Sequence, residues 1–282
     1  MNAVDYTPDE LIIVAMAREL GGEYLVSAVT PFGQLAAVVA KHTHAPDLEL
    51  LATPESGAGS DPWPSISLGQ FQGLSQGAVP ITMEDVFDAI FRDRFRIWIN
   101  PAQIDRHGNV NITAIGPWER PKVALVGSRG IPEDSSHLSQ MLFYILQHSP
   151  RTVVERVDFR SGAGWGPDRE RHLGLAGAPT RLVTNLGVFD FDGPDHSLRL
   201  RSLHPGVTTA AVQEASGCPV VIPPDPPITP PPTPAELAVL RAHDPLELRR
   251  WEWASEVDGL RRRWQEERAH LPLDHPEVRR WR

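Results

Sequence analysis

Eight of the twelve residues at positions 223–234 are proline, and this run constrains the fold more than any other feature of the 282-residue chain. Proline fixes φ and lacks a backbone N–H, so the run is excluded from helix interiors and from central strands. As an extended polyproline-like segment it spans on the order of 37 Å, at about 3.1 Å per residue. The sequence therefore divides into a domain at residues 1–222, a proline-rich linker at 223–234 and a C-terminal extension at 235–282.

Charge is distributed unevenly along the chain. The formal net charge is −9, but residues 241–282 hold ten Arg and nine acidic residues, so the first 240 residues carry −10. With 41% hydrophobic residues, the chain has enough apolar side chains for a sizeable core. Because sequence-independent affinity for phosphate comes from clustered Lys and Arg, we expect no nucleic-acid partner.

The cysteine content and the length of the apolar runs indicate the cellular compartment. Cys218 is the single cysteine, so it cannot form an internal disulfide, and the Cys/His spacings typical of zinc sites are missing. No apolar run approaches the roughly 20 residues that span a bilayer. We therefore expect a cytoplasmic protein that binds no metal and no membrane.

Helix-like and strand-like segments alternate along the first domain. Thr7-Pro8-Asp9-Glu10 is typical of a helix start, and a strand-like segment follows at residues 24–29. Thr30-Pro31 begins a second helix before a strand at residues 48–52. Thr82 begins a third, with Val86, Ile90 and Phe91 facing inward, before a strand at residues 96–99. Further strands are expected at residues 123–126, 153–157 and 181–189, and further helices at residues 135–146 and 208–215. This alternation predicts an α/β sheet with helices packed on it.

The C-terminal extension has a helical pattern of its own. Trp253, Val257, Leu260 and Trp264 recur at the spacing of one helix face. The opposite face mixes both signs of charge, which is unlike a membrane-surface helix. We expect a helical tail that docks on this chain or on a partner.

Candidate chemistry lies in loops after the strand at residues 96–99. Asp105 and Asn109 flank a glycine at residue 108, where they are either turn formers that bond their own backbone or site residues. The run Gly127-Ser128-Arg129-Gly130 can leave backbone N–H groups free to face an anion. Arg129 either pairs with a phosphate or is a solvated surface residue.

Several separated motifs resemble a known family. The run from Gln103-Ile104-Asp105 to Asn109-Val110-Asn111 resembles the β subunit of family I, glutaconate-type CoA-transferases, together with an upstream His44-Ala45-Pro46-Asp47 and a downstream Ser161-Gly162. The segments at residues 185–197 and 202–208 are more specific. They are similar to the actinobacterial branch of that family whose members hydrolyse a ring in cholesterol degradation. The resemblance extends from about residue 7 to residue 245.

This resemblance implies an open, mostly parallel sheet with helices on both faces, followed by the proline-rich strap and the helical tail. It implies an acyl-CoA thioester as substrate, no bound cofactor, and an α-type CoA-transferase-like partner subunit that shares the active site. The residues implied to contact CoA or the acyl group are Gln103, Asp105, Asn109, Asn111, Gly127, Arg129 and Gly130.

The position of the nucleophile decides the implied chemistry. In transferases of this family, a β-subunit glutamate attacks the thioester carbonyl. A gapless count from Ala45 places Thr53 at that position, whereas Glu55 begins the matching Glu-Ser-Gly two residues later, in a Gly-, Ser- and Pro-rich stretch at residues 53–80. Two residues of strand correspond to roughly 6.6 Å. Thr53 favours hydrolytic C–C cleavage, and Glu55 would allow genuine CoA transfer. A third alternative is a non-catalytic assembly subunit, with the strap and tail as a clamp.

Overall fold

The computed structural model describes residues 5–22, 24–27, 30–51, 81–166, 169, 178–245 and 247–252. A seven-stranded sheet forms the centre, in the order β12-β11-β10-β8-β3-β1-β2. Five neighbouring strands, β10, β8, β3, β1 and β2, pair in parallel, and β11 and β12 are antiparallel additions at one edge. Their bounds are β1 Leu25–Ser27, β2 Glu49–Leu51, β3 Phe95–Ile99, β8 Met141–Ile145, β10 Pro179–Thr184, β11 Gly187–Asp190 and β12 Arg199–Leu203.

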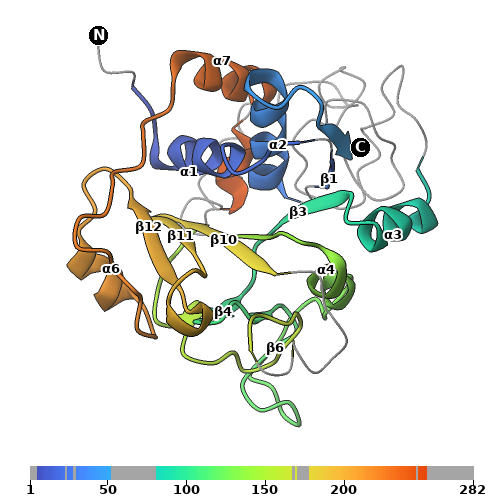
Figure 1. The fold of residues 1–282 in the computed structure, drawn as a ribbon, viewed down its shortest axis with the longest axis vertical. Helices are drawn as coiled ribbons and strands as arrows, with labels where there is room; N and C mark the ends of the chain where they lie inside the picture. Colours follow the sequence, from blue (N-terminus) through green and yellow to red (C-terminus); the bar gives the residue numbers. More distant parts are fainter. Residues whose placement is uncertain are drawn as a thin grey trace, which may run out of the picture.

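Helices cover both faces of this sheet. On one face α1 (Pro8–Ala17), α2 (Pro31–Thr43) and α7 (Pro234–His243) lie side by side (Figure 1). On the other, α3 (Met83–Phe91), α4 (Ile131–His137) and α6 (Thr209–Ala215) contribute to a second apolar cluster. Alternate residues of β8 point to opposite faces of the sheet. Leu142 and Tyr144 belong to the apolar cluster on the side of α2, and Met141, Phe143 and Ile145 belong to the cluster on the other side. The predicted open, mostly parallel α/β architecture is confirmed.

Two small sheets extend from the end of β3. One has the order β5-β4-β9, with β4 Gln103–Asp105, β5 Val110–Asn111 and β9 Val153–Val154. The other is the hairpin of β6 Ala114–Ile115 and β7 Val123–Ala124, whose turn projects from the body of the protein (Figure 1). Short 3-10 turns, η1 (Pro194–His196) and η2 (Leu248–Glu252), complete the described elements.

The predicted starts of helices agree with the capping hydrogen bonds in the structure. Glu10 accepts a hydrogen bond from the Thr7 backbone N–H at 3.0 Å, and Thr82 accepts one from the Asp85 N–H at 3.3 Å. Thr208 caps α6 in the same way, through the Ala211 N–H at 3.2 Å. These signals are confirmed because each depends on neighbours three residues apart and on no tertiary contact.

Several predicted elements are wrong or shorter than expected; the strand expected at residues 153–157, for example, is only Val153–Val154. The helix expected at residues 135–146 is instead the end of α4 followed by β8, all five of whose residues are buried. A continuous apolar run fits a buried parallel strand as well as a helix. The strand expected at residues 181–189 is the β10–β11 hairpin, which turns at residues 185–186. Phe91 is 55% exposed, and of residues 123–126 only Val123–Ala124 forms a strand.

The proline-rich strap lies along the outer edge of β12. The Leu203 N–H donates to Pro227 O at 2.9 Å, and the Thr229 N–H donates to Leu203 O at 2.7 Å. The strap therefore satisfies part of the edge strand's backbone, which would otherwise be open to pairing with another chain. Beyond it, Arg18 of the α1 C-cap binds Glu236 at 2.7 and 2.8 Å, which fixes the start of α7.

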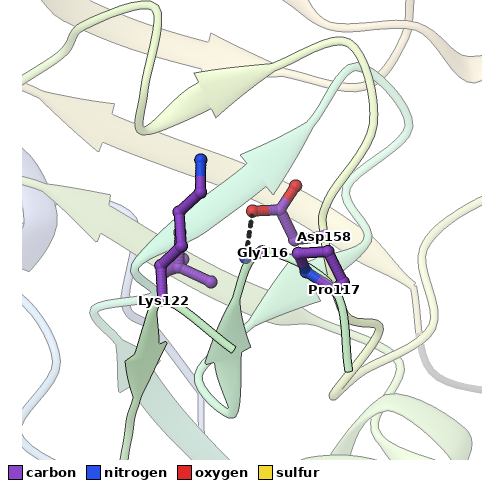
Figure 2. A pocket seen from close by; sticks show the side chains of 5 residues that line it. Gly116, Pro117, Lys122 and Asp158 are labelled. Atoms are coloured by element: carbon purple, nitrogen blue, oxygen red, sulfur yellow. Dashed lines mark hydrogen bonds between the residues drawn. The ribbon is translucent and has the colours of Figure 1, made fainter. Parts of the chain in front are cut away.

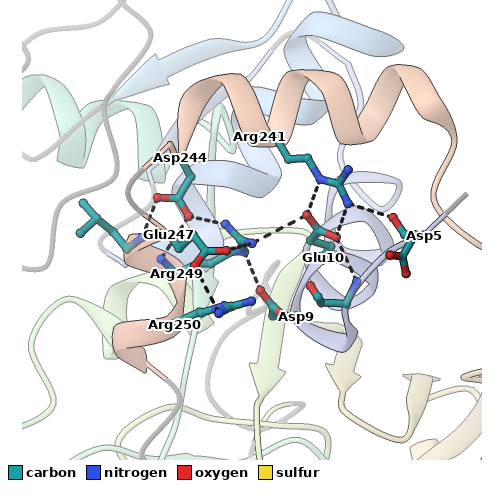
Figure 3. Close-up of polar contacts among 10 residues, drawn as sticks. Asp5, Asp9, Glu10, Arg241, Asp244, Glu247, Arg249 and Arg250 are labelled. Carbon is teal, nitrogen blue, oxygen red and sulfur yellow. Dashed lines mark hydrogen bonds and ion pairs between the residues drawn. The ribbon is translucent and has the colours of Figure 1, made fainter. Parts of the chain in front are cut away.

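Ion pairs hold the rest of the described extension on α1. Arg241 donates to both oxygens of Glu10 at 2.7 and 2.9 Å, and Arg249 bridges Asp9 and Asp244 (Figure 3). The tail helix expected around Trp253–Trp264 lies outside the described residues. Within the described ranges, no helix is long and apolar enough to cross a membrane.

Candidate functional site

The structure brings Gln103 and Asn111 together in a buried network at the β4–β5 pair. Asn111 donates from Nδ2 to Gln103 Oε1 at 2.8 Å and to Ala114 O at 2.7 Å. Its own Oδ1 accepts from the backbone N–H groups of Thr113 and Ala114 at 2.9 and 3.2 Å. Asn111 is 0% exposed, so these bonds fix the turn that leads from β5 into the β6–β7 hairpin.

Gln103 extends the network to Asp158, which sequence reasoning missed. Gln103 Nε2 donates to Asp158 Oδ2 at 3.2 Å, and Gln103 Oε1 accepts from the Asp158 N–H at 3.0 Å. The same Asp158 oxygen accepts from the Gly116 N–H at 2.9 Å. A carboxylate fifty-five residues from Gln103 in sequence therefore holds the base of the hairpin. No motif marked it, because its partners become neighbours only in the folded chain.

A cavity of about 430 Å³ opens beside this network. Figure 2 draws its five lining residues and labels Gly116 and Pro117 at the end of β6, Lys122 before β7, and Asp158; the fifth is Ile115. The Asp158 carboxylate already accepts two hydrogen bonds, whereas Lys122 contributes a cationic ammonium group. The lining therefore holds one cation and one carboxylate, and the Lys122 ammonium group is the part of it that can bind an anionic group such as a phosphate or carboxylate.

Asp105 and Asn109 form a local turn. Asp105 Oδ1 accepts from the backbone N–H groups of His107 and Asn109 at 3.0 Å each, and both of its oxygens accept from Asn109 Nδ2. Burial raises the pKa of the Asp105 carboxyl above its usual value, although those four hydrogen bonds oppose the rise. Of the two roles left open for these residues, the turn is confirmed. The expected contact of these two residues with CoA or the acyl group stays a prediction.

The turn is packed tightly against Gly164. A Cβ at Gly164 would collide with His107 O and the Asn109 nitrogen, so only glycine fits beneath the turn. Asn109 Oδ1 accepts from the Gly164 N–H at 2.9 Å. The predicted downstream motif also contributes here, since Ser161 Oγ accepts from the Ile112 N–H at 2.9 Å and lies 2.7 Å from Thr113 Oγ1.

The Gly127–Gly130 loop runs from β7 to the start of α4 and leaves space around its backbone. An added Cβ at Gly127 or Gly130 would meet nothing within 4 Å. Gly127 and Arg129 have φ of 87° and 52°, and Arg129 is exposed. The loop is tied to the Asn111 network because Ser128 Oγ lies 3.0 Å from Thr113 Oγ1. Its expected role toward CoA stays a prediction.

Thr53 and Glu55 lie outside the described residues. The strand that precedes them, β2, pairs in parallel with β1 and ends at Leu51. The carboxyl ends of β1, β2, β3 and β8 therefore meet at one edge of the sheet, the edge where open α/β folds bind ligands. Among the described residues, no group of three His, Cys, Asp or Glu is placed to hold a metal ion.

The comparisons with known proteins agree with this architecture. Residues 81–215 match the Coenzyme A transferase family. Over 218 residues the chain is 36% identical to the cholesterol ring-cleaving hydrolase IpdB subunit of Mycobacterium tuberculosis, covering 74% of this chain and 83% of that protein.

Solved structures show the same relationship. The IpdAB structure from Rhodococcus jostii RHA1 matches with a TM-score of 0.72 and 32% identity, over 87% of this chain and 98% of that one. Glutaconate coenzyme A-transferase from Acidaminococcus fermentans matches with a TM-score of 0.76 and 25% identity, over 85% and 95% of the two chains. The resemblance seen in the motifs is thus confirmed, and the chain belongs to the coenzyme A transferase family.

Proposed function

We propose that this chain, a β-type subunit of the CoA-transferase fold, acts with an α-type partner to cleave a C–C bond of a cyclic or β-oxo acyl-CoA by hydrolysis. The observation that carries the proposal is the gapless count from Ala45, which puts Thr53 in register with the transferase glutamate, in a chain 36% identical to a ring-cleaving hydrolase subunit. A threonine hydroxyl without an adjacent base is a poor nucleophile, so Thr53 is incompatible with a glutamyl-CoA route.

The described residues support a binding role for this subunit. The β6–β7 cavity supplies the Lys122 ammonium group, and the open Gly127–Gly130 loop offers backbone N–H groups for a phosphate or a developing oxyanion. The partner would supply the general base that activates water. The proposal includes no bound cofactor and a cytoplasmic location.

One assay separates hydrolysis from CoA transfer. The complex of the chain with its α-type partner is incubated with a β-oxo acyl-CoA, with and without a free carboxylate as CoA acceptor. Hydrolysis predicts consumption of the thioester that does not depend on the acceptor, together with a C–C cleavage product. Acceptor-dependent exchange of CoA, with a borohydride-trapped adduct on Glu55 found by mass spectrometry, would establish the transferase alternative instead.

The assembly-subunit alternative has less support. The described strap and extension pack on α1, α2 and β12 of the same chain, which explains their position without a partner. The remaining form of the alternative is a clamp made by the residues beyond 252. Truncation after residue 252 tests this directly. A clamp predicts loss of the complex in size-exclusion chromatography, and an intact complex would remove the alternative.

A further inference from the structure

Glu252 places its carboxyl group at the N-terminus of α2. Its Oε1 accepts from the Phe32 N–H at 2.9 Å, and its Oε2 accepts from the Tyr144 hydroxyl at 2.7 Å. The N-cap residue Thr30 makes no side-chain capping bond. A carboxyl group 220 residues along the chain from Phe32 thus takes the place of a local cap.

A second hydroxyl continues this contact. Thr30 Oγ1 lies 2.5 Å from the Tyr144 hydroxyl, and either group can donate. Tyr144 is 0% exposed, and its ring stacks on Phe32 with the centroids 5.9 Å apart. Thr30 is only half-buried. Tyr144 therefore contacts both Glu252 and Thr30, and the Thr30 hydroxyl also hydrogen-bonds Glu252.

The three groups lie at the carboxyl edge of the sheet. Thr30 follows β1, Tyr144 is near the end of β8, and the intervening strand β3 is followed by Asn100, which also hydrogen-bonds Tyr144. The strand β2, on the other side of β1, leads to Thr53. The cluster thus occupies the edge from which the implied reactive residue comes.

The surroundings of Glu252 keep it ready to exchange a proton. Burial raises the pKa of its carboxyl to about 7, although the Phe32 N–H and the Tyr144 and Thr30 hydroxyls oppose the rise. The arginines of its own segment are engaged elsewhere, Arg249 with Asp9 and Asp244 and Arg250 with Glu247. The groups that face Glu252 from the described elements are uncharged at neutral pH. They are Thr30 and the Phe32 amide at the start of α2, Tyr144 of β8, and Asn100 after β3.

We propose that Glu252, Tyr144 and Thr30 form a proton relay of the acyl-CoA site, in which the C-terminal extension supplies the carboxylic acid. The relay rests on the proposed function. After hydroxide attack breaks the C–C bond, the electron pair remains on the thioester α-carbon. Thr30 gives that carbon its hydroxyl proton, Tyr144 reprotonates Thr30, and Glu252 reprotonates Tyr144. The new C–H bond leaves a Glu252 carboxylate, which the Phe32 N–H and Tyr144 hydroxyl stabilise until solvent returns the proton.

The test uses the full-length chain in complex with its α-type partner. Glu252→Gln keeps the shape but removes the acid, Thr30→Val keeps the size of the side chain but removes the hydroxyl that ends the relay, and Glu247→Gln on the same segment is the matched control. General-acid catalysis is typically worth 10²–10⁴-fold, so kcat is expected to fall at least tenfold in both relay variants and to stay unchanged in the control. In Glu252→Gln, the decline of kcat above about pH 7 is expected to disappear.

A second readout does not require activity. Burial raises the pKa of Asp134 to about 7 as well, so infrared difference spectra between pH 5.5 and 8.5 are recorded in an Asp134→Asn background. They are expected to show a carboxylic C=O band that is lost in Glu252→Gln and kept in Glu247→Gln. The relay is overturned if that band is unchanged in Glu252→Gln, or if both relay variants keep the wild-type kcat and pH profile. If the wild-type complex transfers CoA instead of cleaving a C–C bond, the proposed function fails. The relay as a proton donor to carbon then fails with it, while the band still decides whether Glu252 is a carboxylic acid that titrates near neutral pH.

Discussion

Arg249 Nε lies 2.5 Å from Asp9 Oδ2, and this ion pair joins the C-terminal extension to the first turn of α1 across 240 residues. The side chains of Arg249 and Asp9 are 3% and 9% exposed, and Arg249 also donates to Asp244 at 2.9 Å. Since one buried arginine pairs with carboxylates of both α1 and the extension, the extension is part of the folded core and carries Glu252 to its place on α2.

Removal of Arg249 is therefore expected to be costly. Arg249→Ala leaves Asp9 and Asp244 buried without their cation, and breaking a buried pair in this way typically costs about 3–5 kcal/mol. The loss should appear as a lower free energy of unfolding in urea at pH 7. Arg250→Ala is the control, since Arg250 pairs at 3.2 Å with the more exposed Glu247 and should cost less than about 1 kcal/mol. Equal losses of unfolding free energy in the two variants would contradict the role assigned to Arg249.

Glycine at residue 164 is expected to be irreplaceable. In Gly164→Ala the new methyl group meets His107 O and the Asn109 nitrogen, so the Asp105–Asn109 turn must move. Overpacking against backbone is expected to lower the free energy of unfolding by about 2 kcal/mol or more. Gly130→Ala has open space within 4 Å and no positive φ, so its midpoint in the same urea titration should stay near that of the wild type.

Local chemistry explains which parts of the fold could be predicted. The starts of α1, α3 and α6 follow from capping residues three positions apart, and the strap follows from proline itself. The strand β8 was mistaken for a helix because Met141–Ile145 is apolar at every position, and its periodicity vanishes when both faces are buried.

In the candidate site as well, contacts between residues close in sequence could be predicted and contacts between distant residues could not. The motifs identified Gln103 and Asn111, whose pairing needs only the β4–β5 turn. Asp158 and Glu252 were missed because their partners are distant in sequence: Gln103 for the first, and Phe32 and Tyr144 for the second. Pairings of this kind depend on the order of strands in the sheet, which periodicity does not encode.

His148 is expected to make stability depend on pH. The ring is buried between Thr184 Oγ1 at 3.2 Å and Ser216 Oγ at 2.9 Å, and burial lowers its pKa from 6.5 to about 4. Because the folded state resists protonation, its contribution is complete above pH 6.5 and is lost as the pH falls toward 4. The linkage corresponds to about 3 kcal/mol. In His148→Gln, the difference in unfolding free energy from the wild type should change by about that amount between pH 7 and pH 4, whereas a constant difference would contradict it.

The cavity beside the β6–β7 hairpin is expected to bind an anionic part of the acyl-CoA through Lys122. Lys122→Met removes the cation but keeps most of the aliphatic stem against the cavity wall. A hydrogen bond to a charged group is worth about 1.5–3 kcal/mol, so KM for the acyl-CoA should rise at least about tenfold. The value of kcat should change little, because the contact is made equally in the ground state and the transition state. Arg120→Met on the same hairpin is the control, since Arg120 does not line the cavity and its KM should match the wild type. If the two variants raise KM equally, general attraction by the basic hairpin explains the effect, and the cavity is not the binding site.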